Sequence, residues 1–194
     1  MHKRIFVLAI VVLAMPVLAA ASPELAVGFS PSARHDALNI VLSIINGAQH
    51  NLDVAAYQFT SKPIATALVN AQKRGVSVRV VADLAANSDR YTAITFLVNH
   101  RVPVRLNGQY AIMHNKFIVA DGHSVETGSF NYTSSADKRN AENALLIRNA
   151  PALAAKYQQE FNRLWREASP SKPPGFNPSA TGSFAGAMPS PSLS

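Results

Sequence analysis

Residues 114–131 read HNKFIVADGHSVETGSFN, and this stretch decides the fold of the chain. Two apolar runs that are rich in strand-forming residues, 113–120 and 124–128, flank the pair Asp121-Gly122. An Asp-Gly pair between two such runs is a strong short-range indication of a β-hairpin. The stretch therefore predicts two neighbouring antiparallel strands, with polar residues at the outer end of each.

The segments on both sides of this hairpin alternate between helical and strand periodicity. Apolar residues recur at helical spacing over 38–45, 61–74, 94–98 and 153–164, and strand-forming residues fill 52–59, 76–80, 102–106 and 141–148. Strands that alternate with helices predict an α/β fold. We expect a mixed, largely parallel β-sheet flanked by helices on both faces.

The first 21 residues have the composition of a secretory signal peptide. The basic start Met1-His2-Lys3-Arg4 precedes an apolar run over 5–18 and small residues up to Ala21. This order predicts export to the periplasm or the medium, with cleavage after Ala21 and no stable membrane insertion afterwards. An uncleaved membrane anchor is the alternative, but the run is shorter than the ~20 apolar residues that span a bilayer.

The other end of the chain also differs from the middle. Residues 169–194 are rich in Pro, Ser and Gly and carry one charged side chain, Lys172. Such a segment buries too little apolar surface to offset its ordering entropy, so we predict a disordered tail. Residues 22–168 then form a single domain of ordinary size.

The composition excludes several kinds of site. The chain holds no cysteine, so neither a disulfide framework nor a Cys-ligated metal site can form. Its net charge of +7 falls to +5 once the predicted leader is removed with Lys3 and Arg4. This basic excess favours polyanions such as nucleic acid or anionic lipid without choosing between them. The sequence has neither an acidic cluster nor an H-E-x-x-H pattern, so we expect no metal and no cofactor.

Two pairs of polar residues with the same spacing stand at the ends of the hairpin. His114 and Lys116 are two positions apart, and so are Ser129 and Asn131. Side chains at i and i+2 of a strand face the same side, so each pair points one way. A His and a Lys in an apolar strand cost free energy unless they meet a partner or a ligand. The four groups together suit a phosphate oxyanion.

This convergence predicts phosphoryl transfer, with His114 as the nucleophile or as the general acid and base, because imidazole titrates near neutrality. Taken alone, these residues leave an alternative open, namely a hairpin whose polar side chains are simply solvated.

The stretch also fits the pattern H-x-K-x4-D-x6-G-S-x-N at every fixed position. The matching residues are His114, Lys116, Asp121, Gly128, Ser129 and Asn131. This is the signature of the phospholipase D superfamily, which the chain resembles over most of residues 25–168. Further segments are similar to the small Nuc-type bacterial endonucleases of that superfamily, namely 27–31, 56–60, 73–76, 126–131 and 140–144.

The resemblance implies an α-β-α sandwich and an active site built from two copies of the motif around a two-fold axis. This chain holds one H-x-K, because none of its other histidines has a lysine two residues on. We therefore expect a homodimer with an isologous interface that completes the active site. By resemblance, His114 of one subunit attacks phosphorus and forms a phosphohistidine. His114 of the other subunit protonates the leaving oxygen and then activates water.

The resemblance also assigns roles to the remaining residues. Lys116 and Asn131 of both subunits would hold the phosphate oxygens, with Ser129 hydrogen-bonding nearby, so that no metal is needed. Glu142 matches the family carboxylate that pairs with the histidine and fixes its tautomer. Asp121 belongs to the signature, but we expect it mainly to pin the turn after its strand.

The substrate stays open between nucleic acid and lipid. The first hypothesis is a nonspecific endonuclease that cleaves DNA, with RNA as a further substrate, and it needs no base-reading element. Lys138 and Arg139 would then line a groove for the polyanion, or they are solvated loop residues. The second hypothesis is a phospholipase D acting on headgroups, with 107–112 and 130–132 as candidates for an apolar lip. The third is an inactive nucleic-acid-binding homologue, which the intact motif argues against.

Overall fold

The computed structural model describes residues 22–89 and 92–171, which contain eight strands and five α-helices. The strands are β1 (Glu24–Ser30), β2 (Asn51–Ala56), β3 (Ser77–Asp83), β4 (Val104–Asn107), β5 (Lys116–Ala120), β6 (Ser124–Gly128), β7 (Glu142–Arg148) and β8 (Ser169–Pro170). The helices are α1 (Asp36–Gly47), α2 (Lys62–Lys73), α3 (Ala93–Asn99), α4 (Ser134–Lys138) and α5 (Pro151–Glu167), with a short 3-10 turn at Ala85–Asn87. The predicted signal peptide lies outside the described residues.

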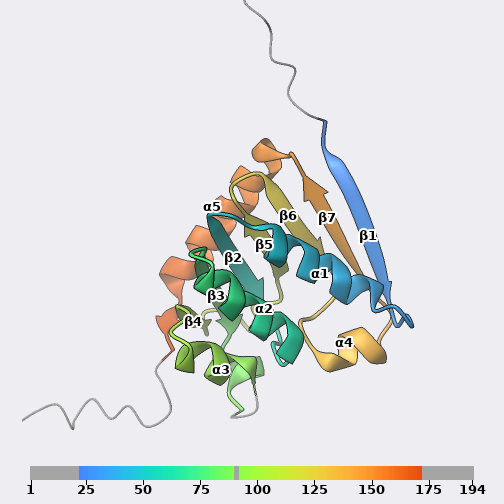
Figure 1. Ribbon diagram of the computed structural model, residues 1–194. Coiled ribbons are helices and arrows are strands. Elements are labelled where there is room, and N and C mark those ends of the chain that lie inside the picture. The colour runs from blue at the N-terminus through green and yellow to red at the C-terminus, as the bar shows by residue number, and fades with distance from the viewer. Residues whose placement is uncertain (1–21, 90–91, 172–194) are drawn as a thin grey trace, which may run out of the picture.

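All eight strands belong to one mixed sheet in the order β1-β7-β6-β5-β2-β3-β4-β8 (Figure 1). The α/β class with a mixed sheet is as predicted, but the expectation of a largely parallel sheet is corrected. Only β2–β3 and β3–β4 pair in parallel among the described strands, and the other five pairings are antiparallel. For β5 and β6 the reason is the short turn at 121–123, because a connection of this length permits only antiparallel neighbours.

The helices form where the sequence has helical periodicity. In α1, the side chains of Leu38, Val41 and Ile45 repeat at that spacing, and all three are buried. In α2, Pro63 stands in the first turn, where its missing N–H costs no hydrogen bond. The chain then leaves α2 through Gly75 at φ +94°, a backbone conformation that favours glycine.

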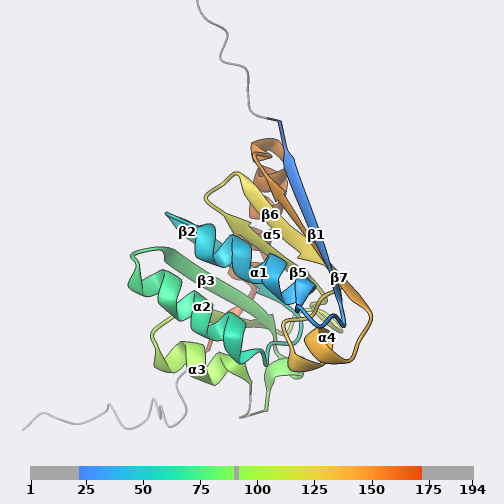
Figure 2. The ribbon, with the colours of Figure 1, turned by 45° about the vertical axis from the view of Figure 1, so that its right-hand side comes forward.

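Two apolar cores join the helices to the sheet, one on each face. α1, α2 and α3 cover one face, where Val41, Leu68 and Ile118 belong to the larger core. α5 covers the other face, where Phe161 packs with Val119 in the smaller core. α5 lies across β2 to β6, whereas α1 covers β1 and β7 from the opposite face (Figure 2). The sheet is therefore flanked by helices on both faces, as predicted.

The end of the described chain corrects one predicted boundary. Ser169 and Pro170, which we placed in the tail, form β8 and pair with Leu106 and Arg105 of β4. The Ser171 N–H adds a hydrogen bond to the Val104 carbonyl at 2.9 Å. The ordered unit thus extends a few residues beyond 168, and residues 172–194 lie outside the described part.

Candidate active site

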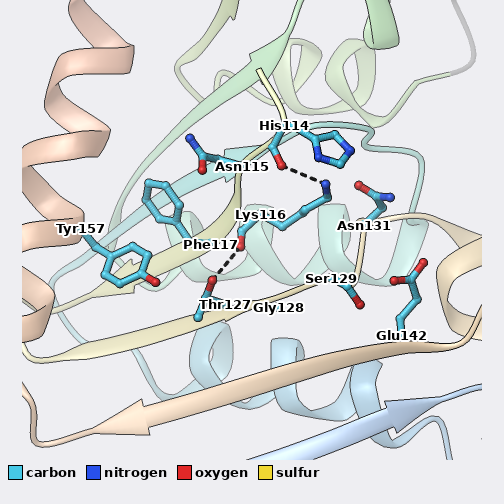
Figure 3. Close-up of a pocket in the computed structure, with 10 residues that line it drawn as sticks. All are labelled: His114, Asn115, Lys116, Phe117, Thr127, Gly128, Ser129, Asn131, Glu142 and Tyr157. Carbon is cyan, nitrogen blue, oxygen red and sulfur yellow. Dashed lines mark hydrogen bonds between the residues drawn. The ribbon is translucent and has the colours of Figure 1, made fainter. Parts of the chain in front are cut away.

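A pocket of about 540 Å³ opens where β5 begins and β6 ends (Figure 3). It is lined by His114, Asn115, Lys116, Phe117, Thr127, Gly128, Ser129, Asn131, Glu142 and Tyr157. The antiparallel pairing of β5 with β6 brings the two halves of the motif to the same edge of the sheet. The structure therefore places five predicted site residues, His114, Lys116, Ser129, Asn131 and Glu142, around one cavity.

His114 lies just before β5 and not within it, which corrects the expectation of a strand position. β5 begins at Lys116, the residue that pairs with the last residue of β2, Ala56. The imidazole is exposed and meets the ring of Tyr57 edge-on, with ring centroids 4.6 Å apart. An exposed imidazole supported by an aromatic ring on one side is accessible to a substrate on the other.

Lys116 is buried beside His114 at the floor of the pocket. Its Nζ donates a hydrogen bond to the His114 carbonyl oxygen at 2.9 Å and lies 5.2 Å from the centre of the Tyr57 ring. Burial lowers the pKa of Lys116, and the nearby negative charge of Glu142 partly opposes this effect. A desolvated ammonium gains strongly from a bound anion, so this position suits a phosphate oxygen.

Gly128 and Ser129 continue from β6 along the pocket wall. A Cβ atom on Gly128 would lie 2.2 Å from the carbonyl oxygen of Asn143, so the close approach of the backbones requires glycine here. The Ser129 Oγ accepts a hydrogen bond from the Asn143 N–H at 3.1 Å. The Gly-Ser pair of the motif thus fixes the spacing between β6 and β7 at the pocket edge.

Asn131 presents an unsatisfied polar atom. Its Oδ1 is buried and has no hydrogen-bond partner within the described chain. Buried polar atoms are nearly always paired, and an exception calls for an explanation. Oδ1 can only accept, so a hydroxyl group or water in the pocket would complete it, whereas the Nδ2 hydrogens of the same side chain can donate to a phosphate oxygen (Figure 3).

Glu142 lies at the start of β7 and also lines the pocket. Its Oε1 accepts a hydrogen bond from Asn140 Nδ2 at 3.1 Å. Within residues 22–89 and 92–171, no hydrogen bond joins Glu142 to His114, so the predicted carboxylate–histidine pair stays a prediction. Burial lowers the pKa of Lys116, and the negative charge of the Glu142 carboxylate partly opposes this lowering.

Asp121 lies at the opposite end of β5, away from the pocket. Its carboxylate accepts hydrogen bonds from the backbone N–H groups of Gln49, His50 and Asn51 at 2.8–2.9 Å. Burial raises the pKa of Asp121, but these hydrogen bonds outweigh it, so that the pKa lies below its usual value. Asp121 therefore joins the turn after β5 to the start of β2, and the structure gives it no contact with the other motif side chains.

Lys138 and Arg139 lie at the end of α4 and are exposed. Neither lines the pocket around His114. Lys138 borders a neighbouring cavity of about 340 Å³ together with Ser61 and Lys62 at the start of α2. The Arg139 guanidinium donates to the Ser135 hydroxyl. Their role in binding a polyanion stays a prediction.

A buried carboxyl on β6, next in sequence to the pocket residue Thr127, was not foreseen from the sequence. Glu126 of β6 is 1% exposed, and its Oε2 accepts a hydrogen bond from the Tyr132 hydroxyl at 2.8 Å. Its Oε1 has no partner in the described residues. Burial raises the pKa of Glu126 to about 8, although the Tyr132 hydrogen bond works in the opposite direction. Near neutral pH this carboxyl is therefore largely protonated.

Sequence reasoning also missed the two aromatic residues of the site. Tyr57 contacts both His114 and Lys116, and Tyr157 of α5 lines the pocket. Both are distant in sequence from the motif. The sequence placed Tyr57 inside a predicted strand over 52–59, whereas the structure ends β2 at Ala56, so that Tyr57 lies at the carboxyl end of the strand, where side chains of an α/β sheet meet at an edge.

No group of three or more His, Asp or Glu residues in the described part of the chain is arranged to hold a metal ion. None of the described helices combines the length and the apolar character needed to cross a membrane.

The fold and the pocket together define a class. A mixed α/β domain with one His-x-Lys pair and one Gly-Ser-x-Asn segment at the same sheet edge is a phospholipase D-like domain. The chain belongs to this family, because residues 41–165 match the family model described as "Cardiolipin synthase, PLD-like domain".

The similar proteins include one solved structure and two curated relatives. The crystal structure of Nuc, a phospholipase D family member from Salmonella typhimurium, is 37% identical and has a TM-score of 0.75. The match covers 78% of this chain and 99% of Nuc. A phospholipase D of Rickettsia prowazekii is 37% identical over 63% of this chain, and a mitochondrial cardiolipin hydrolase of Xenopus tropicalis is 36% identical over 70%. The matches span 60% and 64% of the length of these two relatives.

Proposed function

We propose that this protein is an exported phosphodiesterase that cleaves nucleic acid, above all DNA, without a metal ion and at an active site shared by two copies. The observation that carries this proposal is the pocket in which His114, the desolvated Lys116 and the Asn131 side chain, whose Nδ2 can donate, converge. These groups match the charge and the geometry of a phosphodiester. The similarity to Nuc over 99% of that chain supports a nucleic-acid substrate.

The proposed reaction has two steps at phosphorus. In the first, the imidazole of His114 attacks the phosphodiester, a P–N bond forms and the bond to the leaving oxygen breaks. His114 of the partner subunit gives its proton to that oxygen. In the second, the partner's His114 takes a proton from water, the hydroxide attacks phosphorus and the P–N bond breaks. Lys116 and Asn131 stabilise the charge that builds up on the phosphate oxygens.

The proposal requires a second copy because the pocket contains one histidine of the motif. The described residues place no other histidine in the pocket lining. A single imidazole would have to act as nucleophile and protonate the leaving group at the same time, which its two ring nitrogens cannot do at one phosphate. A two-fold axis beside the pocket supplies the second imidazole.

The test is cleavage of plasmid DNA with EDTA present, using the wild-type protein, His114→Ala and a matched control, His123→Ala. His123 is an exposed histidine in the turn at the other end of β5. We expect the wild type and His123→Ala to nick the plasmid at equal rates and His114→Ala to be inactive. A requirement for added Mg²⁺, or cleavage by His114→Ala, contradicts the proposed chemistry.

A phospholipase is the second candidate, and one observation favours it. Tyr110 and Ile112, shortly before His114, are 40% and 50% exposed and could contact acyl chains. The same three proteins are therefore also assayed on vesicles of phosphatidylcholine and cardiolipin. Headgroup release without DNA cleavage would replace the nuclease proposal by the lipase one.

A further inference from the structure

The Asn131 amide is placed in the pocket by the backbone around it. Its Oδ1 has no hydrogen-bond partner within the described residues, and the side chain points into the pocket (Figure 3). The Phe130 N–H donates to the Asn143 carbonyl oxygen at 3.1 Å, and the Thr133 N–H donates to the Asn131 carbonyl oxygen at 2.7 Å. A donor that stabilises charge on a reacting phosphate acts only if it is in place before the reaction. The contacts that fix this segment therefore fix the amide.

The residue that follows, Tyr132, is fixed at three points. Its carbonyl oxygen accepts hydrogen bonds from the N–H groups of Thr60 and Ser61, both at 2.9 Å. Its ring is 0% exposed and meets the Phe59 ring edge-on, with ring centroids 5.8 Å apart. Its hydroxyl donates to Oε2 of Glu126 at 2.8 Å. The first two contacts hold Tyr132 to the segment after β2, whereas the third holds it to β6, the strand that leads into the pocket.

Glu126 occupies a position inside the sheet, between two neighbouring strands. It pairs with Ile118 of β5 and Leu146 of β7, and both of these residues belong to the larger apolar core. Residues directly opposite on paired strands share a face, so the Glu126 side chain points into that core. Thr127 points to the other face, where its hydroxyl donates to the Lys116 carbonyl oxygen at 3.2 Å. β6 therefore carries one anchor on each face of the sheet.

The hydrogen bond between Glu126 and Tyr132 is a costly feature of an apolar core. The two side chains are 1% and 0% exposed, and Glu126 Oε1 has no partner within the described part of the chain. Apolar side chains of the same shape would be about as stable or more stable. Burial and the charge of Glu126 raise the pKa of Tyr132 well above its usual value, so the hydroxyl keeps its proton. Departures from a well-satisfied core concentrate at functional sites, and Tyr132 directly follows Asn131.

We infer that Glu126 and Tyr132 are positioning residues, whose buried hydrogen bond ties the segment after β6 back to that strand and so directs the Asn131 amide into the pocket. Neither side chain lines the pocket, so each acts through Asn131 and not on the substrate. The inference rests on the proposed function in one respect, namely that Asn131 holds a phosphate oxygen. Without the hydrogen bond the segment is free to shift, and a misplacement of about 1 Å costs about a hundredfold in rate.

The first test is a double-mutant cycle with Tyr132→Phe, Asn131→Ala and the two changes together. The reaction is the hydrolysis of bis(4-nitrophenyl) phosphate, a small phosphodiester that is neither nucleic acid nor lipid. We expect Tyr132→Phe to lower kcat about 10–100-fold with little change in KM, and Asn131→Ala to lower kcat about 100–1000-fold. Because Tyr132 acts through Asn131, Tyr132→Phe should have no further effect in the Asn131→Ala protein. Losses that multiply, or an unchanged kcat in Tyr132→Phe, overturn the inference.

The matched control separates a loss of stability from a loss of positioning. Asp53 is 3% exposed, and its carboxylate accepts two hydrogen bonds from Arg79 at 2.6–2.7 Å outside the pocket lining. We expect Asp53→Asn to lower the midpoint of urea unfolding while kcat stays close to that of the wild type. All rates are measured where circular dichroism shows the proteins to be folded. An equal loss of kcat in Asp53→Asn and Tyr132→Phe shows that activity follows stability, and it overturns the inference.

Glu126 allows a second test that does not depend on Tyr132→Phe and decides the matter if that variant fails to fold. Glu126→Gln keeps a carbonyl oxygen that accepts from the Tyr132 hydroxyl, whereas Glu126→Leu removes the acceptor. We expect kcat of Glu126→Gln to stay close to that of the wild type, and kcat of Glu126→Leu to fall about 10–100-fold. Equal values of kcat in these two variants refute the positioning role.

Failure of this inference and failure of the proposed function are distinguishable. A non-additive cycle on the small phosphodiester supports the positioning role even if plasmid DNA is not cleaved and the nuclease proposal fails. Cleavage of DNA with losses that multiply refutes the positioning role and leaves the nuclease proposal intact. If the wild type hydrolyses neither substrate, the same cycle is measured as the binding of inorganic phosphate by isothermal titration calorimetry. A non-additive weakening then supports the inference, and equal affinities in all four proteins, or no binding by the wild type, overturn it.

Discussion

Replacing Glu126 by Gln will change how the stability of the fold depends on pH. Glu126 is 1% exposed, and burial raises its pKa in the folded protein to about 8, against 4.5 for an ordinary glutamate. Because the pKa of Glu126 is higher in the folded protein than in the unfolded chain, the contribution of this carboxyl to the free energy of unfolding is fully present below pH 4.5. This contribution is lost as the pH rises through 8.

The size of the effect follows from the two pKa values. One unit of pKa is worth about 1.4 kcal/mol, so the raise from 4.5 to about 8 costs the wild type up to ~5 kcal/mol between these pH values. Gln keeps the shape and cannot ionise, but its buried amide hydrogens lack acceptors, which costs about 1–3 kcal/mol at every pH. The variant is therefore less stable than the wild type near pH 4.5 and more stable, by about 2–4 kcal/mol, at pH 9.

The assay is urea unfolding of both proteins at several pH values from 4.5 to 9, followed by circular dichroism. Glu24→Gln is the matched control, because Glu24 is an exposed carboxylate on β1. Its stability difference from the wild type should stay within about 0.5 kcal/mol across the range. If the difference in the free energy of unfolding between the wild type and Glu126→Gln stays the same at every pH, the assignment of a largely protonated carboxyl at neutral pH is refuted.

Other parts of the structure allow three further predictions. Asp121→Ala should lower the free energy of unfolding by about 2–4 kcal/mol in a urea titration, because three backbone N–H groups lose their acceptor, while kcat on DNA changes little. Gly128→Ala should destabilise by about 1–3 kcal/mol or more in the same titration, since its Cβ meets the Asn143 carbonyl, and it should also lose activity through Ser129. Lys138→Ala and Arg139→Ala should each reduce the slope of log K against log salt by about 0.9 in DNA-binding titrations, and an unchanged slope would show that they do not touch phosphates.

The parts of the fold that were predictable are those in which apolar residues point inward. The Asp121-Gly122 turn, the strand 124–128 and the helix after Pro151 were all expected and are present. β1 was not expected because its pattern is inverted. Its small residues face the core under α1 and its large apolar residues face outward. The hydrophobic pattern of this segment therefore does not predict a strand that packs in the core of a single domain. The order of the strands in the sheet could not be predicted either, because the periodicity of apolar residues does not indicate which strands pair.

Only the site residues that lie together in one short segment of the sequence could be predicted. The spacing of His114, Lys116, Ser129 and Asn131 was enough to expect them around one phosphate, and the structure brings them to one pocket. Tyr57, directly after β2 and far away in the sequence, contacts His114 and Lys116 of this pocket. Its contribution depends on the pairing of β2 with β5, and such long-range pairing is set by the whole sheet.

The pairing of β1 with β7 also determines when the molecule can be completed. Glu24 pairs with Arg148, so the first described strand pairs with a strand more than a hundred residues further along the chain. Closing so long a loop is slow compared with local helix formation. The pairs Phe29–Asn143 and Ser30–Glu142 border the pocket edge, so this edge is complete only after this late step.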